Sequence, residues 1–119
     1  MSAPSPCTFC RAVLAAQEGR MHEAIALFET ILQAQPQHHP ARLYRARLYA
    51  LIGRPLDAIE ELNLLTDIAE YALEAHLGLS GVFFLLGMYE DAMHHLSRVR
   101  AYCQAPSEYR RPLPGYARN

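Results

Sequence analysis

The chain contains no lysine, and all eleven of its basic residues are arginine. With twelve acidic residues the net charge is −1, which provides no global attraction to nucleic acid or to an anionic membrane. No apolar run approaches the roughly 18 residues of a membrane span, and the first residues lack a basic segment followed by an apolar one. We therefore expect a cytoplasmic protein with no membrane span and no nucleic-acid partner.

Cysteine is scarce as well, at three residues in a chain of 119. An odd number argues against a disulfide framework and suits a reducing compartment. Hydrophobic residues make up 51% of the chain, which is enough to form a core. We expect one domain over residues 1–104, followed by a proline-rich tail over residues 105–119.

A short sequence pattern occurs three times, beginning at Gly19, Gly53 and Gly87, which are 34 residues apart. An acidic residue stands four positions after each glycine, an alanine follows it, and bulky apolar residues share later columns. The matching positions are Glu23, Asp57 and Asp91; Ala24, Ala58 and Ala92; Ile25, Ile59 and Met93; and Phe28, Leu62 and Leu96. This interval predicts a repeated structural unit.

The residue types around each glycine indicate two helices joined by a tight turn. Glycine ends a helix because it adopts the left-handed conformation without a Cβ clash, and the acidic residue then lies near the positive end of the next helix dipole. Apolar residues recur at helical spacing, in the third copy at Tyr89, Ala92, Met93, Leu96 and Val99. The alanine is small where two helices cross closely.

These signals place the helices along the chain. The predicted first helices cover residues 7–18, 40–52 and 68–86, and the second helices cover 21–34, 55–65 and 89–103. Asp67 and Glu70 have the spacing of a capping box, so the third hairpin is predicted to start early with a long first helix.

This 34-residue period, with its small alanine, bulky apolar column and closing Pro36, resembles the tetratricopeptide repeat family over about residues 5–104. The resemblance implies an all-α fold, an α-solenoid of three 34-residue helix-turn-helix repeats with six helices and an irregular C-terminal tail. The repeats are expected at about residues 5–38, 39–72 and 73–106.

The chain departs from the family pattern at two positions of the repeat. The large aromatic residue early in the first helix is replaced by Thr8, Arg42 and His76. The closing proline becomes Glu70 and Gln104 in the later copies. Both departures weaken the packing between repeats without changing their register.

In proteins with this repeat the first helices line a concave surface, so the resemblance implies a binding groove on them. The groove positions carried over to this chain are Phe9, Val13, Leu43, Arg47, Leu51, Leu77, Phe84 and Leu85. They are mostly apolar, which suits an amphipathic helix of a partner protein. The subfamily that clamps the C-termini of heat-shock chaperones is excluded, because its groove needs lysine. For Leu51 and Phe84, a place in the core between repeats is the alternative.

The groove indicates an adaptor or chaperone that binds a helical partner. In size and number of repeats the chain is similar to the small chaperones of bacterial type III secretion, including those that sequester a needle subunit. The alternative is a self-assembling scaffold, a homo-oligomer formed through Leu96, Val99 and Cys103 on the last helix. In the tail, Tyr109, Leu113 and Tyr116 could instead fold over that helix as an irregular cap.

Little in the sequence indicates an enzyme. Cys103 with His94 or His95 offers a nucleophile and a base, but they share one helix and no third group orients them. Arg42, Arg45 and Arg47 could form a phosphate or carboxylate site. A solvated face, with the arginines paired to glutamates such as Glu60, Glu61 or Glu74, is the simpler interpretation.

Cys7 and Cys10 form a Cys-x-x-Cys pair at the start of a predicted helix, which could serve redox exchange or supply half of a zinc site. Redox chemistry of this kind normally needs a strand before the helix. A zinc site needs two further ligands, and His22, Cys103 and the His38-His39 pair do not have finger-like spacing. We therefore expect no metal and no cofactor.

Overall fold

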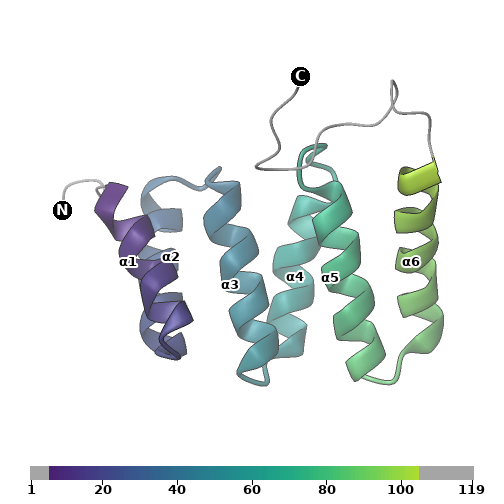
Figure 1. Ribbon diagram of the computed structural model, residues 1–119, viewed down its shortest axis with the longest axis horizontal. Helices are drawn as coiled ribbons and strands as arrows, with labels where there is room; N and C mark the ends of the chain where they lie inside the picture. Colours follow the sequence, from purple (N-terminus) through teal and green to yellow (C-terminus); the bar gives the residue numbers. More distant parts are fainter. Residues whose placement is uncertain (1–5, 105–119) are drawn as a thin grey trace. The chain divides into compact units, whose positions relative to one another are not determined.

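A computed structural model describes residues 6–104, and this range contains six α-helices and no strand. The helices are α1 (Pro6–Gln17), α2 (Met21–Ala34), α3 (His39–Leu51), α4 (Pro55–Leu65), α5 (Ala72–Leu85) and α6 (Tyr89–Gln104) (Figure 1). This confirms the predicted all-α helical repeat. No helix within the described range has the length and apolar character needed to cross a membrane. The predicted tail lies outside the described residues.

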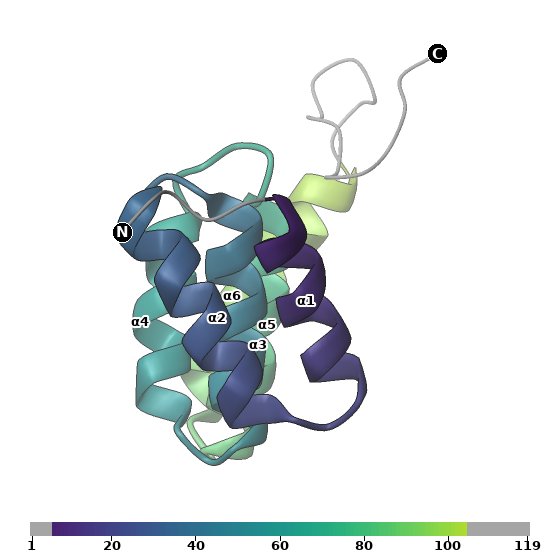
Figure 2. The same cartoon turned by 90° about the vertical axis from the view of Figure 1, so that its left-hand side faces the viewer.

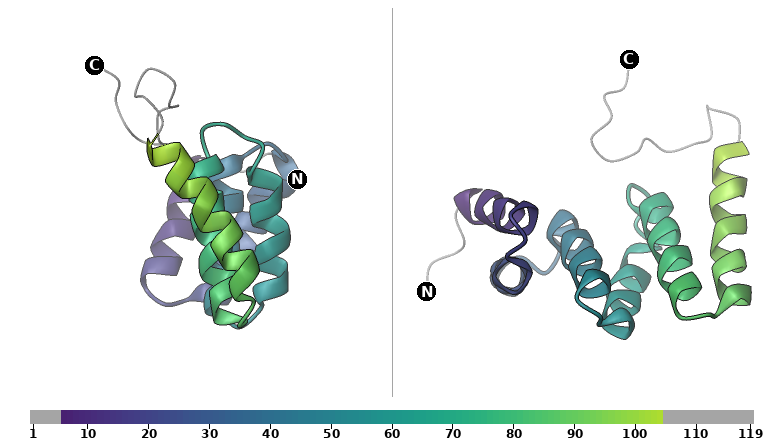
Figure 3. Two further views of the ribbon diagram at one scale, coloured as in Figure 1. Left: turned by 90° about the vertical axis from the view of Figure 1, so that its right-hand side faces the viewer. Right: turned by 60° about the horizontal axis from the view of Figure 1, so that its bottom comes forward.

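The chain divides into two compact units, and the boundary falls inside α4, after Glu61. The first unit contains α1, α2, α3 and most of α4, and Figure 2 shows α1 and α2 running antiparallel within it. The second unit contains the end of α4 with α5 and α6. Helices α5 and α6 pack against each other, and the right-hand view of Figure 3 shows them as neighbours. Each unit is described separately.

The three repeated glycines end α1, α3 and α5, as predicted. Gly19, Gly53 and Gly87 have φ values of +83°, +85° and +77°, in the left-handed region that glycine adopts without strain. At the first of them, the Arg20 N–H donates to the carbonyl of Ala15 at 2.9 Å, and the other two turns repeat this bond. Each glycine therefore satisfies a carbonyl at the helix end and reverses the chain.

The core of the first unit is centred on α2. Its Phe28 is fully buried and stacks on Tyr44 of α3, with ring centroids 5.4 Å apart and an interplanar angle of 11°. Phe9 of α1 meets the same two rings edge-on, at 5.9 Å and 5.8 Å. Ala24 is fully buried, which agrees with its predicted place at a helix crossing. Aromatic packing therefore joins the first three helices.

The core of the second unit contains Leu65 and Leu79, both fully buried. Gly78 of α5 lies so close to α4 that a Cβ built on it would stand 3.0 Å from the Leu62 side chain. Ala92, the third member of the alanine column, is buried where α6 packs on α5. Small residues therefore permit close helix contacts here as well.

The predicted early start of the third hairpin is wrong. Residues 66–71 form turns, and α5 begins only at Ala72, so the sequence spacing of Asp67 and Glu70 does not cap a helix. The reason is local: the Thr66 hydroxyl donates to the carbonyl of Asn63 at 2.8 Å, and thus completes the end of α4. Backbone bonds of the i→i+3 type then carry the chain to Tyr71.

Candidate functional site

The α5 helix exposes three large apolar side chains, Leu77, Phe84 and Leu85, which the sequence analysis assigned to the groove, with the core as the alternative for Phe84. They are 46%, 62% and 79% exposed, respectively. Gly81 lies between them on the same side, because residues four and seven apart share a helix face. We call Leu77, Gly81, Phe84 and Leu85 the α5 face. It is an apolar strip on the second unit that its own core does not use.

A second apolar strip lies on α6, where Tyr89, Met93 and Leu96 are exposed at a spacing of four and three residues. We call these three residues the α6 face. It adjoins the α5 face, because the rings of Phe84 and Tyr89 make an edge-to-face contact at 5.2 Å. The second unit therefore presents apolar side chains from both of its long helices.

The sequence analysis placed Tyr89, Ala92, Met93, Leu96 and Val99 on one apolar stripe of this helix, and it named Leu96 and Val99, but not Tyr89 or Met93, for a possible assembly face. Only Ala92 of that stripe is buried. In the earlier repeats the column of Leu96 is occupied by Phe28 and Leu62, which are both buried. Each of those repeats is followed by another helix, whereas within the described range no helix follows α6. The lack of a following helix in the described range accounts for the exposure of Leu96.

Of the predicted assembly residues, Leu96 and Cys103 are exposed, and Val99 is half-buried.

The groove residues predicted on the first unit are less accessible. Leu43 is only 6% exposed and belongs to the core, so its predicted place in a binding groove is wrong. The cause is that α3 is covered on more than one side: Leu43 and Leu48, which point in different directions on the helix, are both buried. Phe9 and Val13 are half-buried, and only Leu51 and Arg47 are exposed.

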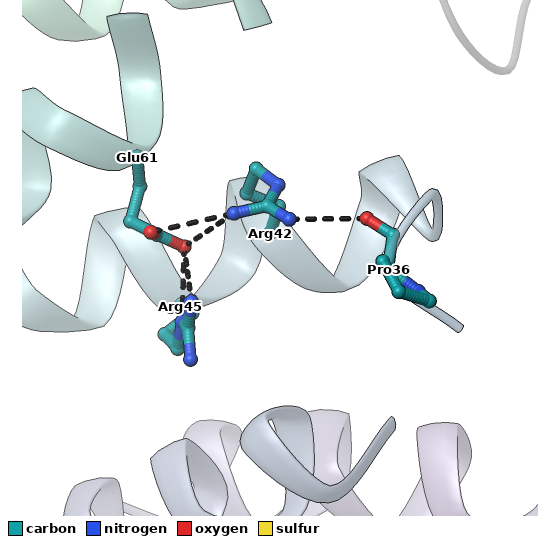
Figure 4. A network of polar contacts seen from close by, with 4 residues as sticks. All are labelled: Pro36, Arg42, Arg45 and Glu61. Atoms are coloured by element: carbon teal, nitrogen blue, oxygen red, sulfur yellow. Dashed lines mark hydrogen bonds and ion pairs between the residues drawn. The ribbon is translucent and has the colours of Figure 1, made fainter. Parts of the chain in front are cut away.

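Arg42 and Arg45 of α3 converge on one carboxylate, that of Glu61 on α4 (Figure 4). Arg45 donates to Glu61 Oε1 from Nε at 3.0 Å and from Nη2 at 2.6 Å. Arg42 lies 3.4 Å from both carboxylate oxygens and also donates to the carbonyl of Pro36 at 3.0 Å. The predicted pairing with a glutamate is present.

This network is not the solvated face that the sequence suggested. The side chains of Arg42, Arg45 and Glu61 are 16%, 14% and 12% exposed. Their charges and donors are directed at one another and at the loop before α3, so they tie α3 to α4 and to that loop. The network therefore has a structural role and offers no open anion site.

The second unit also holds a pair of histidines whose Nδ1 atoms are 2.9 Å apart, His76 of α5 and His95 of α6. Phe83 stacks on the His95 ring with an interplanar angle of 6°. Burial lowers the pKa of both imidazoles, and the neighbouring His94 and Arg98 lower it further. Neutral rings are therefore favoured, with one Nδ1–H donating to the other nitrogen.

Among the described residues, neither this histidine pair nor Cys10 or Cys103 belongs to a group of side chains placed to hold a metal ion. Within residues 6–104, no cluster of three or more His, Cys, Asp or Glu side chains is placed to hold a metal ion. Cys10 is exposed, and the side chain of Cys7 lies outside what the structure describes. His95 packs against His76 and Phe83.

Residues 15–71 match the family model of the tetratricopeptide repeat. The matched range runs from the end of α1 to the turn before α5, just under half of the chain. No curated protein sequence matches this chain. Tetratricopeptide repeats generally mediate protein–protein interaction. Together, the sequence match and the helical hairpins closed by Gly19, Gly53 and Gly87 support the tetratricopeptide repeat family and establish an all-α helical repeat fold of that type.

Proposed function

We propose that the protein is a non-catalytic interaction module that holds an amphipathic helix of a partner protein against the α5 face. The observation that carries this proposal is the exposure of Leu77, Phe84 and Leu85. Apolar area gains about 25 cal/mol per Å² when it leaves water, and a contiguous apolar patch on a folded protein marks an interaction site. Protein binding is also the general role of the repeat family.

The geometry of the α5 face suits a helix better than an extended strand. Leu77, Gly81 and Phe84 follow one another at four and three residues, the spacing with which helical anchors interlock. A Cβ built on Gly81 would meet no atom within 4 Å, so the space between Leu77 and Phe84 is open. A partner side chain of leucine size fits such a position close to the backbone.

The apolar α5 face extends the proposal to the kind of partner. The partner is proposed to be a small helical subunit with an apolar face of its own, such as a type III secretion needle subunit. The complex would form in the cytoplasm, where an aggregation-prone subunit needs a chaperone. In this role the α5 face would replace the contacts that the subunit makes after assembly.

Site-specific crosslinking tests the surface. A photo-reactive amino acid is placed at position 84, at position 77 and, as a control, at Glu29, which is exposed on α2. In the native host we expect one discrete adduct from positions 84 and 77 and none from position 29. The crosslinked segment of the partner should be an amphipathic helix, and Phe84→Asp should abolish the complex while the circular dichroism spectrum stays unchanged.

Two results would refute the proposal. One is an equal yield of the adduct from position 29, which would indicate nonspecific contact. The other is a complex that persists in the Phe84→Asp variant, because a charge buried without a partner in an apolar contact costs several kcal/mol.

A second candidate function is self-assembly through the α6 face. It is favoured by the exposure of Tyr89, Met93 and Leu96 next to Phe84, in a repeat that no described helix follows. A second copy of the chain, docked on this face, would form a homo-oligomer. Light scattering of the isolated protein should then show an oligomer that Met93→Glu dissociates, and a monomer at all concentrations would exclude this function.

A further inference from the structure

A pocket of about 300 Å³ lies within the second unit, between the turn before α5, the start of α5 and the end of α6. Leu73 and Val99 form part of its wall, together with two alanines, Ala72 and Ala101. None of the residues of the α5 face lines it. The pocket is therefore a feature separate from the surface of the proposed function.

Four side chains with polar groups complete the lining: Thr66, His76, Arg98 and Tyr102. Arg98 is the only one of them with a permanent charge. Arg20, Arg42, Arg45 and Arg54 each pair with a carboxylate. Arg98 has no such partner within residues 6–104. Its positive charge lies close enough to His76 and His95 to lower the pKa of both imidazoles.

We propose that this pocket binds a small organic anion, a carboxylate carried on a short apolar body, with Arg98 as the charge partner. The guanidinium has the planar donor geometry that a carboxylate matches. The apolar wall of Leu73 and Val99 accommodates the body of the ligand, since sites of this kind combine apolar walls with a few polar groups. The pocket volume of about 300 Å³ has room for a small ligand of this kind.

Binding of such an anion has a second consequence at His76. The imidazole is now surrounded by groups that disfavour its charged form, namely His95, Arg98 and His94, in addition to burial. On α6, Asp91 acts in the opposite direction on His95. An anion next to Arg98 offsets that positive charge, so the pKa of His76 rises when the ligand binds. By linkage, affinity increases as the pH falls through that pKa, as long as the carboxylate stays ionised.

The experiment uses the full chain and hexanoate as the probe, with the His76 ring signal followed by heteronuclear NMR. Hexan-1-ol tests the need for the charge, and inorganic phosphate tests the need for the apolar body. Arg98→Gln removes the proposed charge partner. Arg100→Gln is the matched control, because Arg100 is an exposed arginine on the same helix that does not line the pocket. Ala101→Phe fills the pocket without changing charge.

We expect a saturable shift of the His76 signal with hexanoate and a higher pKa of His76 in the complex. Arg98→Gln should weaken binding at least tenfold, as loss of a charge-assisted hydrogen bond does. Arg100→Gln should change affinity less than twofold, and Ala101→Phe should abolish binding. The inference is overturned if hexanol or phosphate binds as tightly as hexanoate, if both arginine variants weaken binding equally, or if no saturable shift occurs up to about 10 mM probe.

Discussion

Glu61→Ala should destabilise the first unit far more than the loss of an exposed carboxylate does. The substitution leaves Arg42 and Arg45 next to each other, with side chains only 16% and 14% exposed and no counter-charge. Two like charges that are held out of water repel each other and keep their desolvation cost. The Arg42 bond to the Pro36 carbonyl remains, but it is directed to a neutral acceptor.

The magnitude follows from the contacts. Arg45 donates two good bonds to the carboxylate, at 3.0 Å and 2.6 Å, and a hydrogen bond to a charged group contributes about 1.5–3 kcal/mol. The Arg42 contacts at 3.4 Å are long and add little. Breaking a buried ion pair costs about 3–5 kcal/mol. Because water still reaches 12% of the Glu61 side chain, we expect the lower end, about 3 kcal/mol.

Urea unfolding of the full chain measures this loss, and hydrogen exchange of the α3 amides assigns it to the first unit, since different parts of a protein can open separately. The matched control is Asp57→Asn, which breaks an exposed ion pair with Arg54. The side chains of Arg54 and Asp57 are 53% and 40% exposed. A surface pair contributes about 0.2–1 kcal/mol. The reasoning would be refuted if the two variants lost stability by amounts within about 0.5 kcal/mol of each other. The buried network would then contribute no more than an exposed ion pair.

Further predictions concern single positions and pH, with urea unfolding as the measurement. Gly53→Ala should lower the free energy of unfolding by about 1–2 kcal/mol, because φ at this position is +85°. Gly81→Ala should raise the free energy of unfolding by about 0.5–1 kcal/mol, because the new methyl group meets open space on a helix. Effects of the same sign would contradict this pair. Ala92→Leu should lower the free energy of unfolding by about 1–3 kcal/mol, because the larger side chain overpacks the buried contact between α5 and α6. An unchanged free energy would show that Ala92 does not lie in that contact. Burial lowers the pKa of His76 and His95 below 6.5, so their contribution to stability is present above pH 6.5 and is lost as the pH falls through the lowered values. In the double variant His76→Gln/His95→Gln, the free energy of unfolding should fall less steeply as the pH is lowered below 6.5. If it falls as steeply as in the unmodified protein, other groups cause the decrease.

Sequence reasoning succeeded where a structure depends on neighbouring residues. The turns at Gly19, Gly53 and Gly87 need a residue that tolerates positive φ, and the 34-residue interval shows where. The ranges of α2 and α4 were predicted from apolar spacing for the same reason. The start of α5 was not, because Asp67 and Glu70 have the spacing of a capping box whether or not a helix begins there.

The candidate site could be predicted only in part. The exposure of Phe84 and Leu85 agrees with the positions that the repeat register marks, but Leu43, marked in the same way, is in the core. Glu61 was one of three possible partners for the arginines, and nothing in the sequence indicated that the pair is mostly buried. The pocket next to Arg98 joins residues of the turn, α5 and α6, and no motif connects them.

The sequence by itself determined the repeat, its turns and the helical class of the protein, because each depends on backbone preferences and on spacing within one helix. The tertiary structure decided which of these apolar and charged side chains are open to a partner. Phe28, Leu62 and Leu96 occupy one column of the repeat, yet only Leu96 is exposed. Burial depends on the atoms that a distant part of the chain brings to a side chain, and no local pattern contains that information.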